Sequence, residues 1–438
     1  MSASPASATD DRERSFDEQV ARSLPRNVAA QLFNGMFGQT GFRLVQAPTF
    51  LPAYLHALSG SDVVVGLARS LQAAGTVLSP VIGASLIGHR GSILGISLGL
   101  GALMRLNILG IALAGFLLGA GEAIYAVLVM LTLMGFFQGA SQVTMNSLRA
   151  KVIPVQRRGI VAGMRNLLAG IASASVSYVA GAYVIERNLL GNGYASVFLL
   201  AFAIGMIGLA GLGFTREPVT VSVRAQESVR GTIARLPALL RENPDFARFF
   251  VARAIGSFGR MAMPFYILFA GTRMELTGAS LGLLTSIWMV TSSMTNLVWG
   301  VLADRRGYRV VMIATLAIWI VANAQLLFTS DVSGMVAFFV TMGMAQGGFN
   351  QSGQNMVLEF GRTEDIPIRL AASSTAVNFV GTIGPLLGGA IAALWSYHAL
   401  FVTCIVLQSI ALAIIVVWVP EPRLASLAVR GAVASGDD

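Results

Sequence analysis

Long apolar stretches separated by short polar segments run through most of the chain. Each stretch is close to or longer than the ~20 residues that an α-helix needs to cross a lipid bilayer. Read in chain order as spans 1 to 12, they predict transmembrane helices at residues 28–57, 62–87, 92–118, 122–148, 159–185, 195–214, 247–272, 279–303, 308–328, 332–357, 370–395 and 398–419. The predicted fold class is therefore an all-α membrane protein with twelve transmembrane helices.

The longest internal polar stretch lies between spans 6 and 7 and divides the spans into two sets of six. The first residues of the chain are polar and carry both signs of charge, as solvated disordered tails do. The predicted organisation is a cytoplasmic disordered tail (1–27), an N-terminal six-helix bundle (28–214), a cytoplasmic central loop (215–246), a C-terminal six-helix bundle (247–419) and a cytoplasmic tail (420–438).

The composition agrees with a membrane protein and explains the positive charge. Hydrophobic residues make up 55% and charged residues 12% of the chain, against about 25% charged residues in soluble proteins. The net charge is +9, and most of the basic residues fall in the tails and in the loops on the same side. The opposite loops contain only Arg187 and Arg273. The positive-inside rule therefore places both termini in the cytoplasm and accounts for the charge without nucleic acid as a partner.

Several short segments recur in the same order in both halves. The segment Gly300-Val-Leu-Ala-Asp-Arg-Arg-Gly307 follows span 8, and the similar segment 84–91 follows span 2. Gln138-Gly139 in span 4 matches Gln346-Gly347 in span 10. Matches in one order at similar offsets indicate an internal duplication.

These motifs resemble those of the major facilitator superfamily. Residues 300–309 are similar to the loop signature of that family, and residues 381–389 resemble a Gly/Pro signature of its drug antiporters. The resemblance covers residues 28–420. It implies two pseudo-symmetric six-helix bundles, a monomer, a central cavity lined by spans 1, 4, 7 and 10, and alternating access to a small-molecule substrate.

The resemblance also implies a cytoplasmic gate. In the family, the acidic residue of the loop signature faces a helix N-terminus of the other half, where the helix dipole and free amides stabilise a carboxylate. The N-terminal copy has Gly88 and His89 at the corresponding positions. The expected gating residues are therefore Asp304, Arg305 and Gly307, with Arg158 at the start of span 5; the alternative is that Asp304 is a solvated loop charge.

Two arginines lie about halfway along spans 1 and 7. A charge at bilayer mid-depth costs at least ~2.5 kcal/mol, so its presence suggests a function. Arg43 is followed by Pro48, and Arg260 by Pro264. A guanidinium matches a carboxylate or phosphate with two parallel hydrogen bonds, so both side chains are predicted to contact an anionic substrate. The alternative is that they satisfy backbone carbonyls freed by the prolines.

Spans 4 and 10 each carry amide side chains at positions i, i+4 and i+8, which share one helix face. An amide stripe that faced lipid would leave its donors and acceptors unsatisfied, so both stripes are predicted to line the cavity. Interhelical packing is the alternative. The residues are Gln138, Gln142 and Asn146 in span 4, and Gln346, Asn350 and Gln354 in span 10.

The remaining arginines within spans receive weaker assignments. Arg165 and Arg253 lie near cytoplasmic ends, where their side chains are expected to extend towards water. Arg69 lies in the outer third of span 2 and is expected to extend outwards. Arg105 in span 3 receives no role.

No Asp or Glu falls in the middle of any predicted span, which removes the usual proton or sodium relay of a coupled carrier. The chain shows no Walker motif, no catalytic triad and no metal-ligand spacing, and its single cysteine is Cys404. The prediction is a non-enzymatic transporter of a small organic or phosphate-bearing anion, without cofactor or metal, in the bacterial inner membrane and in contact with lipid. Two alternatives stay open: efflux of neutral or lipophilic compounds, and a non-transporting assembly factor or receptor.

Overall fold

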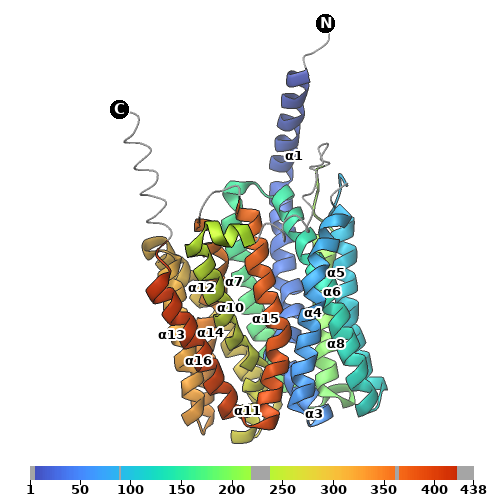
Figure 1. The fold of residues 1–438 in the computed structure, drawn as a ribbon. Coiled ribbons are helices and arrows are strands. Elements are labelled where there is room, and N and C mark those ends of the chain that lie inside the picture. Colours follow the sequence, from blue (N-terminus) through green and yellow to red (C-terminus); the bar gives the residue numbers. More distant parts are fainter. Residues whose placement is uncertain (1–4, 88–89, 219–236, 361–364, 422–438) are drawn as a thin grey trace. The chain divides into compact units, whose positions relative to one another are not determined.

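The computed structural model describes residues 5–87, 90–218, 237–360 and 365–421. All regular elements in these ranges are helices (Figure 1). Ten of the helices are long and apolar enough to cross a membrane, and the other two predicted spans are divided into shorter segments. The twelve-helix prediction is confirmed in this form.

The ten continuous spans agree with the predicted boundaries to within four residues. Two of them end in a different helical form: the π-helix η2 follows α7, and the 3₁₀ helix η5 follows α14. They are α4 (Asp62–Ile87), α5 (Leu94–Leu117), α6 (Ala120–Val152), α7 (Val155–Val179) with η2 (Ala180–Ile185), α8 (Gly193–Leu212), α12 (Gly278–Arg306), α13 (Tyr308–Phe328), α14 (Val332–Asn355) with η5 (Met356–Glu359), α15 (Ile366–Leu394) and α16 (Tyr397–Trp418).

Spans 1 and 7 are interrupted near their prolines. A proline has no N–H to donate, and its ring clashes with the preceding turn. Pro48 lies in the break before α3, and Pro264 lies within a 3₁₀ segment. Span 1 consists of α1 (Pro5–Phe33), π-helix η1 (Asn34–Gly38), α2 (Gln39–Gln46) and α3 (Phe50–Ser59), and span 7 of α10 (Pro244–Ser257), 3₁₀ helix η4 (Phe258–Phe265) and α11 (Tyr266–Arg273).

Helix α1 begins at Pro5, within the stretch that the sequence assigns to a disordered tail. The chain divides into two compact units. The first unit contains residues 1–46, 75–176 and 190–226, and the second contains residues 47–74, 177–189 and 227–438. The division of the spans into bundles at 28–214 and 247–419 stays a prediction.

Glycines allow close helix packing in the first unit, where η1 and α2 pack on α8. A Cβ added to Gly41 would lie 2.3 Å from the carbonyl oxygen of Ala201, and one on Gly208 would lie 2.1 Å from the backbone nitrogen of Gly38. Such contacts between small residues are a common way for membrane helices to associate.

The second unit also includes the end of span 1, the beginning of span 2 and the end of span 5, which are residues 47–74 and 177–189. There the hydroxyls of Thr49 and Thr285 lie 2.5 Å apart and are buried. A Cβ added to Gly66 would lie 2.3 Å from the carbonyl oxygen of Pro385. Residues 47–74 are therefore integral to the packing of this unit.

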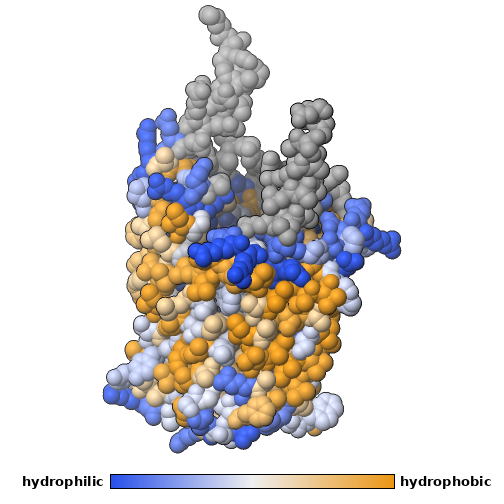
Figure 2. All heavy atoms as spheres, turned by 90° about the vertical axis from the view of Figure 1, so that its left-hand side faces the viewer, coloured by the Kyte–Doolittle hydropathy of each residue, from blue (hydrophilic) through white to orange (hydrophobic). Residues whose placement is uncertain are grey.

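The outer surface of the second unit is apolar over most of the helix length. Figure 2 shows hydrophobic residues gathered on the face that carries α13 and α16, with hydrophilic residues at both ends. This arrangement suits a lipid environment, where side chains have no water to bond. Exposed apolar side chains on these and adjoining helices include Leu297, Val298, Val321, Val406 and Val417.

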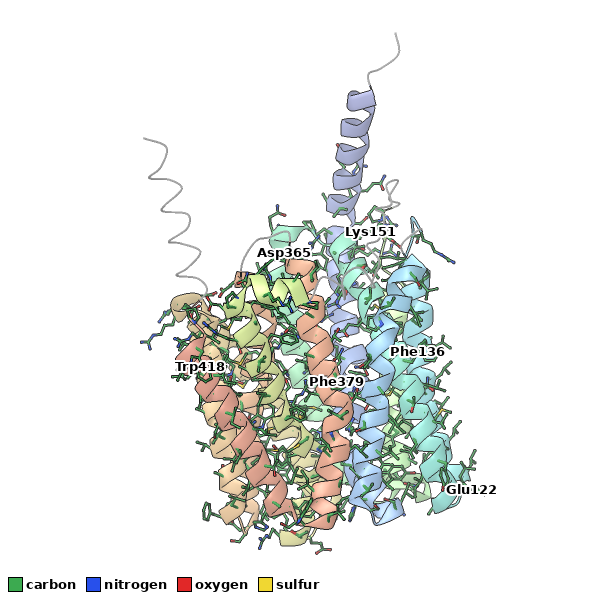
Figure 3. All side chains as sticks on the ribbon, viewed as in Figure 1. Glu122, Phe136, Lys151, Asp365, Phe379 and Trp418 are labelled. Carbon is green, nitrogen blue, oxygen red and sulfur yellow. The ribbon has the colours of Figure 1, made fainter. Side chains whose placement is uncertain are left out.

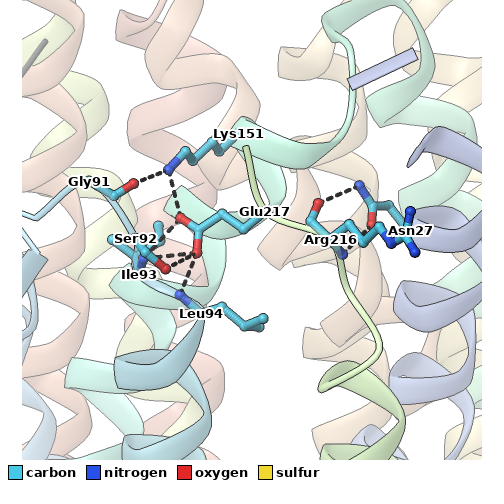
Figure 4. Close-up of polar contacts among 8 residues, drawn as sticks. All are labelled: Asn27, Gly91, Ser92, Ile93, Leu94, Lys151, Arg216 and Glu217. Carbon is cyan, nitrogen blue, oxygen red and sulfur yellow. Dashed lines mark hydrogen bonds and ion pairs between the residues drawn. The ribbon is translucent and has the colours of Figure 1, made fainter. Parts of the chain in front are cut away.

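A buried carboxylate fastens one end of the first unit (Figure 4). Glu217 accepts hydrogen bonds from the backbone N–H groups of Ile93 (2.9 Å) and Leu94 (2.8 Å), from Ser92 Oγ (2.8 Å) and from Lys151 Nζ (2.7 Å). Burial alone would raise the pKa of Glu217, but these four donors outweigh it, so the pKa lies below its usual value. The carboxylate also complements the dipole at the start of α5.

Candidate substrate site

Arg43 is half-buried on α2 in the first unit. One turn earlier on the same helix, Gln39 Oε1 lies 3.4 Å from Arg43 Nη2. One turn later, Gln46 Nε2 donates to Gln138 Oε1 on α6 at 3.2 Å. The predicted arginine of span 1 therefore belongs to a polar face of that helix, and this face contacts the first amide of span 4.

The same glutamine also meets an arginine of span 5. When the Gln39 amide is turned over, Oε1 accepts from both Nε and Nη2 of Arg165, each at 3.0 Å. Two bonds at 3.0 Å are stronger than one at 3.4 Å, so this orientation is the better one. It turns the amide NH₂ group of Gln39 towards Arg43, because one amide oxygen cannot face both guanidiniums.

The side chain of Arg165 packs against span 1 at Gly35, where no side chain is in its way. A Cβ on Gly35 would lie 2.0 Å from Arg165 Cγ and 2.9 Å from its Cδ. Gly35 is part of the π-helix η1, and π-helical turns are frequent at functional sites. The absence of a side chain at residue 35 is what allows the stem of Arg165 to lie against span 1.

A cavity of about 160 Å³ opens beside Arg165 in the first unit. No acidic side chain is among its described lining residues, whereas three arginines are. The lining consists of Gln31, Asn146, Arg149, Ala150, Ile153, Arg158, Val161, Ala162 and Arg165.

The three lining arginines differ in the hydrogen bonds that they donate to other groups of the protein. Arg158 donates to the carbonyl oxygen of Ile153 at 2.9 Å and to that of Ala150. Arg149 donates from Nη2 to Asn146 Oδ1 at 2.5 Å and from Nε to the carbonyl oxygen of Met145 at 3.1 Å. Arg165 bonds to Gln39 alone among the interactions described here.

The amide stripes are only partly engaged. In the first unit, Gln142 and Asn146 are exposed on α6. In the second unit, Gln346 is buried, and it accepts from Trp288 Nε1 at 2.9 Å and donates to Met263 Sδ at 3.2 Å. Asn350 is half-buried and Gln354 is exposed further along α14 and away from these partners.

The arginines of span 7 have tighter surroundings. Arg260 is half-buried on η4. Arg253 is 7% exposed and donates from Nη1 to Ser373 Oγ on α15. A Cβ on Gly353 would lie 2.8 Å from Arg253 Nε, so the helices enclose this guanidinium. Arg165 and Arg253 thus bond to neighbouring spans instead of extending to water as the sequence suggested.

Two other arginines within spans, the buried Arg105 and the half-buried Arg69, satisfy backbone carbonyls. Arg105 donates to the carbonyl oxygens of Gly205 (2.7 Å) and Gly101 (2.8 Å). Arg69 donates to the carbonyl oxygen of Ala47 (2.9 Å), which lies at the break in span 1. Arg69 therefore satisfies a backbone carbonyl beside Pro48, which is the structural role that the sequence offered as an alternative for Arg43.

The predicted gating residues lie at the ends of their helices. Asp304 and Arg305 are exposed near the end of α12. Gly307 has φ 85°, a backbone conformation that favours glycine, and a Cβ there would lie 2.3 Å from Oε1 at the end of the Glu421 side chain. Gly88 and His89 lie outside the described residues. The gate itself stays a prediction.

The sequence reading missed Gln31, Gln39 and Arg165 as members of one site. A signal was present, because Gln39 precedes Arg43 by one helical turn, as the amides of spans 4 and 10 precede one another. The contact of Arg165 depends on Gly35 and on the π-helix, and no helical periodicity reveals that. Within the described residues, no group of His, Cys, Asp and Glu side chains is arranged to hold a metal ion.

Comparisons with known proteins agree with this architecture. The family model described as Major Facilitator Superfamily matches residues 249–435. The multidrug resistance protein MdtG of Salmonella choleraesuis (strain SC-B67) is 23% identical over 306 residues, which cover 67% of this chain and 72% of MdtG. The efflux pump azaK of Aspergillus niger is 35% identical over 111 residues, 25% of this chain and 23% of the pump.

A solved structure of the nucleoside transporter NupG shares the fold, with a TM-score of 0.72 and 14% identity, over 88% of this chain and 99% of that structure. The fold and these matches define a multi-pass transport protein of the membrane, not an enzyme. The match over residues 249–435 and these similarities support a transporter of the major facilitator superfamily.

Proposed function

We propose that this transporter carries a small anionic solute, either an organic acid or a phosphate-bearing compound, by alternating access. The observation that supports this most is the cavity of the first unit, which is lined by arginines and has no acidic side chain in its described lining. A cationic substrate would be repelled there. A neutral one would leave the charges unmatched at a considerable desolvation cost.

Arg43 and Arg260 are the proposed charge partners on spans 1 and 7. Both lie next to irregular backbone, which in transporters is tolerated where it lines a cavity. The proposed polar contacts to the rest of the substrate are the amides Gln138, Gln142, Asn146, Gln346, Asn350 and Gln354.

The proposed setting is the inner membrane of a bacterium, with both termini in the cytoplasm and the protein a monomer. Asp304, Arg305 and Gly307 form the proposed cytoplasmic gate with Arg158. Asp304→Asn keeps the shape of the side chain and removes its charge. We expect it to change the transport rate and the labelling of cytoplasmic-side cysteine probes; unchanged values of both would remove the gate from the proposal.

The names of the relatives favour a second candidate. MdtG and azaK are described as a multidrug resistance protein and an efflux pump, and NupG as a nucleoside transporter. In that case the substrate would be neutral or lipophilic, and the arginines would be structural. A non-transporting receptor or assembly factor is the third candidate.

Transport by the full-length protein in proteoliposomes separates these candidates. Phosphate, a dicarboxylate, a nucleoside and a lipophilic dye are tested with the wild type, Arg43→Ala and Arg260→Ala. The anion proposal expects uptake or exchange of an anion, with a large loss in both variants. Transport of the dye or the nucleoside alone supports the second candidate, and no transport or binding of any probe supports the third.

A further inference from the structure

We infer that His56 and Asp62 form a binding site for a proton at the outer ends of spans 1 and 2, and that the external pH controls the opening of these ends through this site. The outer side is the side opposite to both termini. The inference goes beyond the proposed function and rests on it for alternating access and for the orientation of the chain. The proton has a regulatory role, because a proton bound at the outer end returns to the same side.

The residues of this site come from three helices. His56 lies in the last turn of α3, Asp62 is the first residue of α4, and Tyr397 is the first residue of α16. The other end of α16 carries Trp418 (Figure 3). In a chain with both termini in the cytoplasm, the connections between spans 1 and 2 and between spans 11 and 12 lie outside. The three residues therefore belong to the outer side.

The two atoms that face each other need a proton between them. His56 Nδ1 lies 3.2 Å from Asp62 Oδ1, and neither buried atom has another hydrogen-bond partner among the described residues. A carboxylate oxygen only accepts, so Nδ1 carries the proton of the neutral ring. A second proton on Nε2 makes the ring a cation and turns the contact into an ion pair. The His56 side chain is 42% exposed, so external water can supply this proton.

Asp62 lies where α4 packs closely against α15. A Cβ added to Gly389 would lie 2.8 Å from the carbonyl oxygen of Asp62, and one added to Gly66 would lie 2.3 Å from that of Pro385. The Asp62 side chain is 13% exposed, and the hydroxyl of Tyr397 donates a hydrogen bond to its carboxylate. Opening of the outer ends would part α4 from α15 and α16 and return this carboxylate to water.

The charge of His56 decides the cost of keeping Asp62 in this packed arrangement. With a neutral ring the pair has a net negative charge, and with a protonated ring the pair is neutral overall. A largely buried charge is costly unless it is paired. Proton binding therefore favours the packed arrangement, and this contribution is lost as the pH rises. Histidine side chains change their charge between about pH 5 and 8, so the effect is expected in that range.

Helix α11 packs on α3, and its two ionisable side chains contact other groups. The Arg273 guanidinium lies over the Phe269 ring, 5.2 Å from the ring centre, and Arg273 Nη2 is 3.4 Å from His398 Nε2. Tyr266 donates to Asn323 Oδ1 at 2.9 Å. Neither side chain is bonded to Asp62 among the described residues.

Helices α15 and α16 add no second charge partner for Asp62. The stretch of α15 that meets α4, residues 385–389, has no ionisable side chain. On α16, Tyr397 is a neutral donor, and the next residue, His398, lies beside the cation of Arg273. In the described part of the chain, His56 is therefore the ion-pair partner of Asp62.

The alternative is that the pair only holds the turn between spans 1 and 2. Gly60 has φ 62°, and Ser59 Oγ accepts from the N–H of Ser61 at 3.2 Å, so the turn also has supports of its own. A purely local role would make stability depend on the pair without changing the packing of α4 against α15. Measuring both quantities separates the two roles.

The first measurement is a double-mutant cycle on the full-length protein in detergent, without substrate. It uses His56→Gln, Asp62→Asn and the double variant, with unfolding temperatures recorded at pH 5.5 and pH 8. We expect a coupling of about 1 °C at pH 5.5, as for a partly exposed ion pair, and none at pH 8. His398→Gln is the matched control, because this histidine is exposed on the same side beside Arg273. It should show no coupling to Asp62→Asn at either pH.

The second measurement follows the opening itself. Spin labels are attached at Ala57→Cys on α3 and Leu394→Cys at the end of α15, two exposed positions, after Cys404→Ala removes the native thiol. From pH 5.5 to pH 8, the share of molecules with the longer label distance should rise about two- to fivefold. His56→Gln should remove this dependence on pH. If Asp62→Asn does not fold, Tyr397→Phe serves as the second variant, and it should raise that share at both pH values.

Each other outcome contradicts a defined part of the inference. Coupling of equal size at both pH values, or a label distance that still depends on pH in His56→Gln, overturns the proton site. Coupling confined to pH 5.5 with a label distance that ignores pH leaves the pair a local role and overturns the control of opening. Neither measurement uses a substrate, so these failures leave the anion proposal standing. Failure of anion transport in proteoliposomes, with both results here as expected, overturns the proposed substrate and keeps the proton site.

Discussion

Arg165 of the first unit and Arg253 of the second unit illustrate two ways of burying a guanidinium in a membrane protein. Arg253 is enclosed, with Ser373 as its partner and Gly353 packed against its Nε. Arg165 is half-buried beside a cavity and donates to the amide oxygen of Gln39. The first arrangement encloses the guanidinium among packed helices and leaves its Nε without a hydrogen-bond partner among the described residues, whereas the second lies beside a cavity that a ligand could enter.

The comparison shows that residue type and depth alone do not define a substrate site. Arg43 and Arg260 occupy similar places in spans 1 and 7. Each has a second arginine nearby, Arg165 beside Arg43 and Arg253 beside Arg260, and these two neighbours differ in their burial and hydrogen bonds. We therefore expect recognition of the negative charge of the substrate to depend more on residues of the first unit than the symmetry of the sequence implies. Three substitutions test this difference, in order of decreasing expected effect.

Gly35→Ala should have the largest effect, because the new methyl group would occupy the place of Arg165 Cγ. We expect a loss of stability of about 3 kcal/mol, at the upper end of the usual cost of overpacking, and anion binding at least about tenfold weaker. Thermal unfolding in detergent and ligand titration measure the two effects.

Gly163→Ala is the matched control, since it lies on the same helix as Arg165 and its added Cβ would meet no atom within 4 Å. It should leave both measurements unchanged. If Gly35→Ala bound the anion as tightly as Gly163→Ala does, the position of Arg165 would not matter for binding.

Ser373→Ala should separate stability from binding. It removes the acceptor of the enclosed Arg253 guanidinium, and an unsatisfied buried charged donor costs about 2 kcal/mol. We expect a lower unfolding temperature with unchanged anion affinity. Weaker anion binding with an unchanged unfolding temperature would show that Arg253, and not Arg165, behaves as a ligand contact.

Glu217→Gln should have the smallest effect, about 1 kcal/mol, because the amide oxygen still accepts hydrogen bonds, although the charge and the second acceptor oxygen are lost. The folded state lowers the pKa of Glu217 from its ordinary value of 4.5. Its stabilisation is therefore present above about pH 4.5 and is lost as the pH falls through the lowered pKa. Unfolding temperatures from pH 7 to pH 3.5 should fall further for the wild type than for the variant, and parallel curves would contradict this.

The spans could be predicted because each follows from a single local quantity, apolar length. The ends of α4 and α13 agree with the prediction to the residue. The breaks in spans 1 and 7 were signalled by Pro48 and Pro264 but not read as interruptions. The π-helical turns η1 and η2 contain no proline, and the hydrophobic pattern does not predict them.

The candidate site was less accessible to sequence reasoning. Arg43 and Gln138 could be selected because charged and amide side chains are unusual inside spans. The contact between Arg165 and Gln39 joins helices more than a hundred residues apart, and it depends on an absent side chain at Gly35. Periodicity within one helix carries no information on such a contact, so the sequence predicts only a side chain that extends towards water from the cytoplasmic end of span 5.

The joint between Lys151 and Glu217 also gives the molecule a built-in chemical label. Lys151 is the only lysine of the chain, so apart from the N-terminus its ε-amino group is the sole target for amine-specific reagents. That group is bonded to Glu217 and to the carbonyl oxygen of Gly91, and its side chain is 11% exposed. The rate of its acylation would report how often the carboxylate releases it, without any engineered substitution.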